Sequence, residues 1–163
     1  MRALFHLSVV ALIVVTGCAS PNRRRRVTSD THKPITISYS DTYGILRYES
    51  HPVFRASING VSGYFLIDTG ATTPILTVTA ARRCGLTVFS PPASEATRDF
   101  WGQKIRMMKA TNVVAELAPG FTVHWPEVLV SGEEGFFGIV DYLTLKAANA
   151  VIDTKSRTIT FTK

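Results

Sequence analysis

One short stretch of this 163-residue sequence carries an acidic side chain in a setting that favours chemistry. Residues 64–67 are largely apolar and lead directly into Asp68, which Thr69 and Gly70 follow. A carboxylate at the end of an apolar strand is costly unless hydrogen bonds satisfy it. The backbone N–H of Gly70 can donate such a bond, and the Thr69 hydroxyl can support the turn. The spacing therefore predicts that Asp68 is a candidate catalytic carboxylate.

A purely structural explanation of the same three residues stays open. Asp and Gly are common where a strand ends, because an Asp side chain closes a turn onto the following backbone and Gly accepts most backbone conformations. Three residues do not decide between an ordinary turn and a catalytic loop.

The elements that must position Asp68 are predicted to be short strands. Apolar and polar residues alternate over 35–40, as in a half-buried strand. Strands over 53–58 and 63–67 flank Asn59-Gly60, a turn signal, and the interval predicts a loop slightly longer than two residues. Further strands are predicted over residues 104–117, 121–130, 150–153 and 158–161. The fold class is therefore mainly β.

Helix signals are few and short. Residues 77–84 contain good helix formers and are followed by Gly85, which readily accepts the left-handed conformation that ends a helix. Residues 140–148 are a second candidate. The sequence thus predicts one or two short helices beside the strands.

The context of the acidic loop resembles a known family. Asp68-Thr69-Gly70-Ala71 after an apolar strand is similar to the active-site loop of aspartic peptidases, and one such copy in a chain of this length resembles the single-lobe retropepsins. The resemblance covers roughly residues 50–163 and implies a retropepsin-like acid protease barrel, a domain that we place at residues 34–163. It makes Asp68 catalytic and residues 69–72 the active-site loop: Thr69, Gly70, Ala71 and Thr72.

A downstream segment extends this resemblance. In the family, two hydrophobic residues and a glycine run behind the catalytic loop, and Phe136, Phe137 and Gly138 match them. The family's flap resembles residues 98–103, with Trp101 and Gly102 as a mobile cover, although the aromatic residues there are equally compatible with a core position.

One carboxylate does not perform aspartic proteolysis alone. The reaction needs two close carboxyl groups, one ionised to take a proton from water and one protonated to polarise the scissile carbonyl. A single Asp-Thr-Gly implies that the second group comes from another copy across a two-fold axis. A homodimer acting on a protein or peptide substrate is expected. Water is the nucleophile, so no cofactor is required.

Other candidate residues are given structural interpretations. Neither Asp141 nor Asp153 is followed by Thr-Gly or Ser-Gly, so we interpret them as a helix-side carboxylate and a turn residue. Cys84 is expected to be a small buried hydrophobic residue. The histidines and cysteines have no metal-ligand spacing, and no metal site is predicted.

The N-terminus predicts export and anchoring. Residues 1–17 have a positive start and an apolar run too short to span a bilayer, as in a signal peptide. Residues 15–18 resemble the lipobox of bacterial lipoproteins, which implies acylation of Cys18 and attachment to a membrane of the cell envelope. Ala19 at the next position implies the outer membrane, facing the periplasm. A plain signal peptide followed by an incidental cysteine is the alternative.

Residues 18–33 are predicted to be a polar tether that carries most of the excess charge. Five of the 18 lysines and arginines lie at Arg2 and at residues 23–26. The other 13 are nearly balanced in charge by the 12 acidic residues. The four consecutive arginines either are solvated or contact anionic lipid. Nucleic acid is disfavoured as a partner, because no stacking aromatic residues alternate with the arginines.

The sequence therefore predicts a membrane-anchored aspartic endopeptidase that is active as a homodimer. The alternative is an envelope lipoprotein with the same fold that binds peptides or partners without cleaving them, because a fold does not fix a function. An intact Asp-Thr-Gly favours the enzyme.

Overall fold

The computed structural model describes residues 25–29, 33–41, 52–92, 97–98, 104–105, 107–132 and 136–163. The predicted signal peptide, Cys18, Trp101 and Gly102 lie outside these residues. The elements, in chain order, are β1 (Arg26–Ser29), β2 (Ile35–Ser38), β3 (Val53–Ile58), β4 (Val61–Asp68), β5 (Ile75–Thr77), α1 (Val78–Arg83), β6 (Thr97–Arg98), β7 (Lys104–Ile105), β8 (Met108–Ala118), β9 (Phe121–Ser131), β10 (Gly138–Asp141), α2 (Tyr142–Ala147), β11 (Val151–Asp153) and β12 (Thr158–Phe161).

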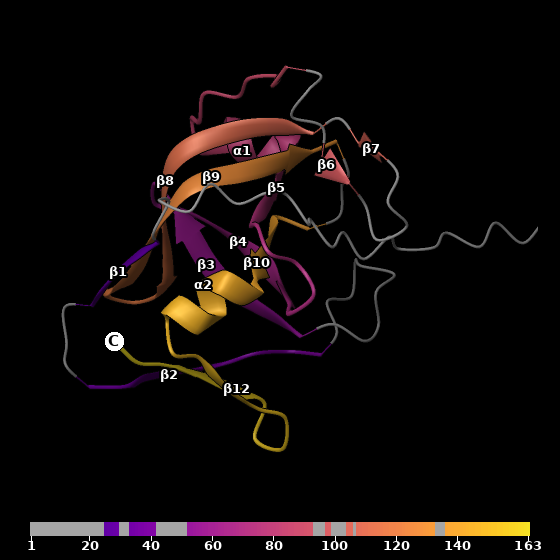
Figure 1. Cartoon of the computed structure of the whole chain (residues 1–163). Coiled ribbons are helices and arrows are strands. Elements are labelled where there is room, and N and C mark those ends of the chain that lie inside the picture. The colour runs from indigo at the N-terminus through magenta and orange to yellow at the C-terminus, as the bar shows by residue number, and fades with distance from the viewer. Residues whose placement is uncertain are drawn as a thin grey trace, which may run out of the picture.

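Six of these strands close into a barrel. Neighbouring strands follow the order β9, β5, β10, β4, β3 and β8, and the long β8–β9 hairpin closes the ring because β8 also pairs with β9. That hairpin forms a curved wall on one side of the molecule (Figure 1). The mainly β class and the barrel that the sequence predicted are confirmed.

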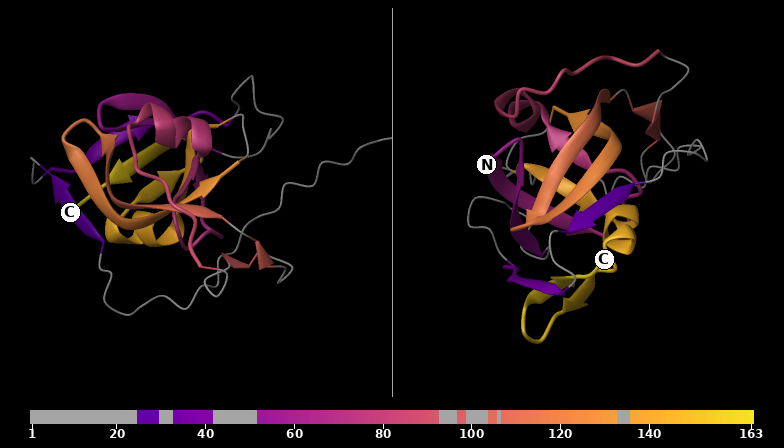
Figure 2. Two further views of the ribbon diagram at one scale, coloured as in Figure 1. Left: turned by 90° about the horizontal axis from the view of Figure 1, so that it is seen from above. Right: turned by 90° about the vertical axis from the view of Figure 1, so that its left-hand side faces the viewer.

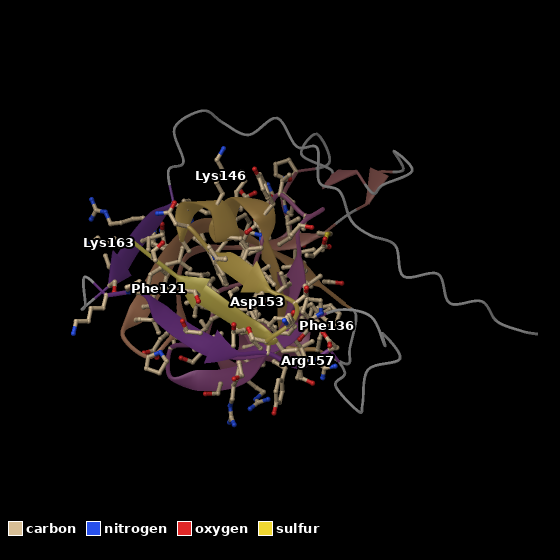
Figure 3. The ribbon with its side chains drawn as sticks, turned by 90° about the horizontal axis from the view of Figure 1, so that it is seen from below. Phe121, Phe136, Lys146, Asp153, Arg157 and Lys163 are labelled. Atoms are coloured by element: carbon tan, nitrogen blue, oxygen red, sulfur yellow. The ribbon has the colours of Figure 1, made fainter. Side chains whose placement is uncertain are left out.

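A second, three-stranded sheet lies at one end of the barrel, in the order β11, β12 and β2. Figure 3 shows this end of the molecule, with Asp153 at the end of β11 and Arg157 in the turn before β12. Ile159 and Phe161 of β12 are fully buried, and the Phe161 ring lies 5.2 Å from that of Phe121 in β9. The small sheet thus shares the core of the barrel.

The packing of β4 explains the apolar run before Asp68. Phe65 and Ile67 of β4 belong to the main core, whereas Leu66 between them packs in a separate cluster with Val53. The end of β4 is therefore buried on both faces, and this accounts for its uninterrupted apolar run. The Phe65 ring packs against Trp125 from β9, with 6.3 Å between ring centroids.

The β3–β4 connection corrects one prediction. Ile58 pairs directly with Val61, so the loop contains only Asn59 and Gly60, not the longer interval up to Gly63. Both loop residues have positive φ, 51° and 76°, as the tightest twisted hairpins require. Two residues therefore suffice to reverse the chain, and β4 begins at Val61, two residues earlier than predicted.

The first strand extends the sheet into the segment predicted to be a tether. Residues Arg26–Ser29 form β1, which pairs antiparallel with residues 121–124 of β9. The strand lies on the same edge of β9 as β5, which pairs with residues 129–131. In the right-hand view of Figure 2, β1 lies along β9, and Arg25, just before β1, pairs with Asp141, the N-cap of α2. The sheet thus includes residues before residue 34, because β5 pairs with only the last part of the long β9 and leaves the first part of that edge open to β1.

Both predicted helices are present, and one begins later than expected. Thr77 caps α1 by accepting a hydrogen bond from the Ala80 N–H at 3.0 Å, and Gly85 follows its end with φ of +67°. Residues 140 and 141 belong to β10, so α2 starts at Tyr142. Within the part of the chain that is described, no helix has the length and apolar character needed to cross a membrane.

Candidate active site

Asp68 is the last residue of β4, a strand that lies between two others. β3 pairs with it antiparallel on one side, and β10 runs parallel to it on the other. The Asp68 side chain is largely buried, with 9% of its surface exposed. Two neighbouring strands therefore fix the backbone from which this carboxylate projects.

Hydrogen bonds within the loop hold one oxygen of the carboxylate, and the Gly70 N–H is one of the donors, as the sequence predicted. Asp68 Oδ1 accepts from the Gly70 N–H at 2.8 Å and from the Ala71 N–H at 3.3 Å. Both bonds use the same oxygen, so neither of them occupies Oδ2. A charge-assisted bond to a backbone N–H is stronger than a neutral one. The loop thus holds Oδ1 of the carboxylate and leaves Oδ2 for other contacts.

The rest of the loop is anchored through its backbone. Ala71 is fully buried, and its carbonyl accepts from the Tyr142 N–H at 2.9 Å, where α2 begins. Thr69 is exposed and Thr72 is half-buried. The assignment of residues 69–72 to an active site stays a prediction, but the structure places all four beside Asp68 in one tight turn.

The three residues compared with the family's supporting strand lie directly behind the loop. Gly138 begins β10 and stands opposite Phe65 of β4 and Leu76 of β5. A Cβ atom on Gly138 would lie 2.6 Å from the Phe65 ring and 2.7 Å from the Ile75 carbonyl oxygen. Only glycine fits between these strands.

Phe137 connects this support to β4 and α1. Its N–H donates to the Tyr64 carbonyl at 3.0 Å, and its ring lies against Gly63, where a Cβ would be only 2.0 Å from the ring. The Arg83 guanidinium lies 5.7 Å from the centre of the same ring. Phe136 is half-buried and packs against the small cluster of Val53 and Leu66. Gly63 was not predicted as part of this support, although a glycine inside a strand is a signal of close approach.

Asp141 is closer to the loop than the sequence interpretation implied. It is the last residue of β10 and stands in register with Asp68 across the parallel pair. It is also the N-cap of α2, because its Oδ1 accepts from the Thr144 N–H at 3.3 Å and from the Thr144 hydroxyl. Its description as a helix-side carboxylate is correct, and the signal for a cap was an Asp directly before the helix.

The other oxygen of Asp141 is paired with an arginine that the sequence analysis placed in the tether. Arg25 Nη1 lies 2.8 Å from Asp141 Oδ2, and the two side chains are 12% and 0% exposed. Burial raises the pKa of Asp141 above its usual value, while the charge of Arg25 and the bonds from Thr144 act against this rise. Burial also disfavours the charged form of Arg25 and therefore lowers its pKa, and the charge of Asp141 opposes that shift. Each group therefore needs the other to remain charged inside the protein.

The remaining candidates lie elsewhere. Asp153 ends β11 in an exposed hairpin turn, in agreement with its interpretation as a turn residue. Cys84 is buried, as expected, and burial raises the pKa of its thiol. Among the described residues, no three His, Cys, Asp or Glu side chains gather closely enough to hold a metal ion.

Known structures have the same architecture. The chain is similar to the crystal structure of a retropepsin-like aspartic protease from Rickettsia conorii, with 17% identity over 85% of this chain and 91% of that one, and a TM-score of 0.51. It is also similar to EIAV protease in complex with the inhibitor HBY-793, with 20% identity over 69% of this chain and 98% of that one, and a TM-score of 0.50. No protein-family model and no curated protein matches the sequence. The barrel, the acidic loop on β4 and the supporting strand β10 thus form a retropepsin-like fold.

Proposed function

We propose that this protein is an aspartic endopeptidase in which Asp68 acts on water and on the scissile peptide bond. The observation that carries the proposal is the setting of Asp68: a buried strand end, one oxygen held by two backbone N–H groups, and a supporting parallel strand. The retropepsin-like fold adds support, because its neighbours include proteases with this architecture. Protein or peptide substrates follow from this reaction class.

The second carboxyl group is proposed to be Asp68 of another copy. Asp141 is the nearest alternative along the sheet, but its Oδ1 is engaged by Thr144 and its Oδ2 by Arg25. A carboxylate with both oxygens engaged in this way is a poor partner for a catalytic water. A two-fold axis beside the loop brings two identical carboxyl groups together instead.

Within this dyad, the two carboxyl groups take different roles. The ionised one accepts a proton from water as the water oxygen bonds to the scissile carbon, while the protonated one donates to the carbonyl oxygen. The resulting tetrahedral intermediate breaks at the C–N bond. The carboxyl group that took a proton from water gives it to the leaving nitrogen, and a hydroxyl of the intermediate returns a proton to the other carboxylate, which restores the singly protonated pair. The protein supplies the dyad and its orientation, and water supplies the nucleophile.

The dyad predicts a distinctive dependence on pH and on concentration. Only the singly protonated pair is active, so the rate should be bell-shaped in pH, falling where both groups are protonated and again where both are ionised. Because the site forms between two copies, specific activity should also fall on dilution. The test assays the purified full-length protein in detergent against a mixed peptide library, over a broad pH range and a wide dilution series.

Two outcomes of that assay would contradict the proposal. Specific activity that persists unchanged where sedimentation detects only monomer would exclude a shared dyad. Absence of cleavage at every pH and concentration would favour the alternative, an envelope lipoprotein that binds peptides without cleaving them.

We also propose that the enzyme is lipid-anchored in the bacterial cell envelope, at the outer membrane and facing the periplasm. The support is in the sequence: a signal-like segment over residues 1–17, a lipobox-like segment that ends at Cys18, and Ala19 after it. Cys18→Ser should give an unacylated protein that leaves the membrane fraction, as measured by mass spectrometry and fractionation. An unchanged acyl content and continued membrane retention would exclude this anchor.

A further inference from the structure

The four consecutive arginines of the N-terminal segment do not share one environment. The Arg25 side chain is mostly buried, whereas Arg26, its neighbour in β1, is exposed. A guanidinium is rarely buried without a specific partner, because removing a charge from water is costly. The partners of Arg25 therefore indicate its role.

Arg25 makes two contacts with its two terminal nitrogens. Nη1 pairs with Asp141 Oδ2 at 2.8 Å, and Nη2 donates to the Thr72 carbonyl at 3.2 Å. The planar fork of arginine suits two fixed acceptors at once, which a lysine ammonium does less well. One side chain thus connects the residue just before β1, the start of α2 and the acidic loop.

The acceptor Asp141 is itself fixed to the core. Thr144 binds Asp141 and accepts from Trp125 Nε1 at 2.9 Å, and the Trp125 side chain is fully buried in β9. The loop is tied at Ala71 by the Tyr142 N–H and at Thr72 by Arg25. The two ties are adjacent, and they hold the residues immediately after the Asp68 turn from two different elements.

We propose that Arg25 is a positioning residue of the proposed peptidase: through Thr72 and Asp141 it holds the loop in the conformation in which Asp68 acts. This inference rests on the proposed function for its effect on catalysis, but the clamp itself does not. A buried ion pair is weak evidence for stability. Arg25 joins the acidic loop at Thr72 to Asp141 at the end of β10, and this link points to conformational control of the loop.

The test uses full-length variants and one readout that needs no activity. Arg25→Ala removes both contacts, and Arg25→Lys keeps the charge near Asp141 without the fork. Arg26→Ala, at the adjacent exposed position, is the matched control. Amide hydrogen exchange reports on the loop, because the Gly70 and Ala71 N–H groups bind Asp68 Oδ1. Steady-state kinetics give kcat and KM separately.

The proposal expects Arg25→Ala to raise exchange at Gly70 and Ala71 by about tenfold or more beyond any rise in β3 and β9, which report the loss of global stability. Peptidase kcat should fall about 10- to 100-fold with KM nearly unchanged, since a slight misplacement of a catalytic group has effects of this size. Arg25→Lys should lie between Arg25→Ala and wild type, and Arg26→Ala should match wild type.

Unchanged exchange at both loop amides would overturn the proposal, and so would an equal increase throughout the barrel, which indicates only global destabilisation. If Arg25→Ala fails to fold, Arg25→Lys decides the same question. A wild-type protein without peptidase activity would refute the proposed function, and the exchange data would still decide whether Arg25 positions the loop.

Discussion

Two aspartates of this chain end a strand and turn in the same local way. Asp68 follows β4 and accepts from the N–H groups two and three residues later, at 2.8 and 3.3 Å. Asp153 follows β11 and accepts from the Lys155 and Ser156 N–H groups, at 2.8 and 3.1 Å. A threonine comes directly after each aspartate. By local hydrogen bonding alone, the two turns are almost equivalent.

Their surroundings differ. Asp68 ends a strand of the barrel and is 9% exposed, whereas Asp153 is exposed at the end of a hairpin strand. The Asp153 turn lacks the glycine, a supporting strand in parallel register and a tie to a helix. The comparison teaches that the Asp-centred turn is a general device. Burial and support from β10 distinguish the candidate site.

Removing the charge from each aspartate gives the largest expected contrast. Asp68→Asn should lower peptidase activity by about 10³-fold or more, because the amide fills the same space and does not act as a base. Asp153→Asn removes a carboxylate whose pKa is lowered chiefly by the Ser156 N–H, and it should leave activity unchanged. Cleavage of a fluorogenic peptide by the two purified variants measures this contrast. Equal loss in both would mean that the surroundings do not matter.

Asp141 extends the comparison to an aspartate with a charged partner. Arg25→Ala should destabilise the protein at neutral pH by about 3 kcal/mol, because it leaves a buried carboxylate without its counter-ion. Burial raises the pKa of Asp141 in the folded state, and loss of Arg25 raises it further. A carboxyl group whose pKa is raised by folding contributes its full stabilisation of the folded state below its unfolded-state pKa. That contribution is lost as the pH rises through its folded-state pKa.

The destabilisation by Arg25→Ala should therefore grow with rising pH and be smallest in acid. Denaturant unfolding of wild type and variant at about pH 3.5 and about pH 7 measures this difference, and Arg26→Ala, on the exposed face of β1, serves as control. A difference that is constant with pH would show that Asp141 does not titrate against Arg25.

The support behind the Asp68 turn can be tested with a pair of glycines. Gly138→Ala should cost about 2 kcal/mol, because the new methyl group meets the Phe65 ring and the Ile75 carbonyl. Gly132→Ala places its methyl group in open space and should have little effect. Thermal unfolding of both variants is sufficient, and similar melting temperatures would show that β10 does not pack tightly behind the loop.

Local patterns predicted the parts of the fold that local interactions determine. The alternation over 53–58, the good helix formers before Gly85 and the apolar run before Asp68 each reflect one element, and β3, α1 and β4 lie there. The tight Asn59-Gly60 turn was placed correctly, but its length depends on the register of two strands, which a single pattern does not determine.

Some contacts between residues far apart in the sequence were not predicted. Arg25 lies in a run of like charges, and such a run indicates solvent exposure. Its burial depends on Asp141, more than a hundred residues away, and on an open edge of β9. The register between Asp68 and Asp141 likewise arises only when β10 inserts between β4 and β5. No local signal carries that information.

The central claim is that two copies of Asp68 form one site, and a mixing experiment tests it most directly. Wild type and Asp68→Asn are combined in equal amounts, allowed to exchange subunits, and assayed at a fixed total concentration at which dimers prevail. If both carboxyl groups are needed, only about a quarter of the dimers carry two of them, and activity should fall to about a quarter of the value for wild type alone. A value of about one half would mean that each copy acts independently, and it would contradict the shared dyad.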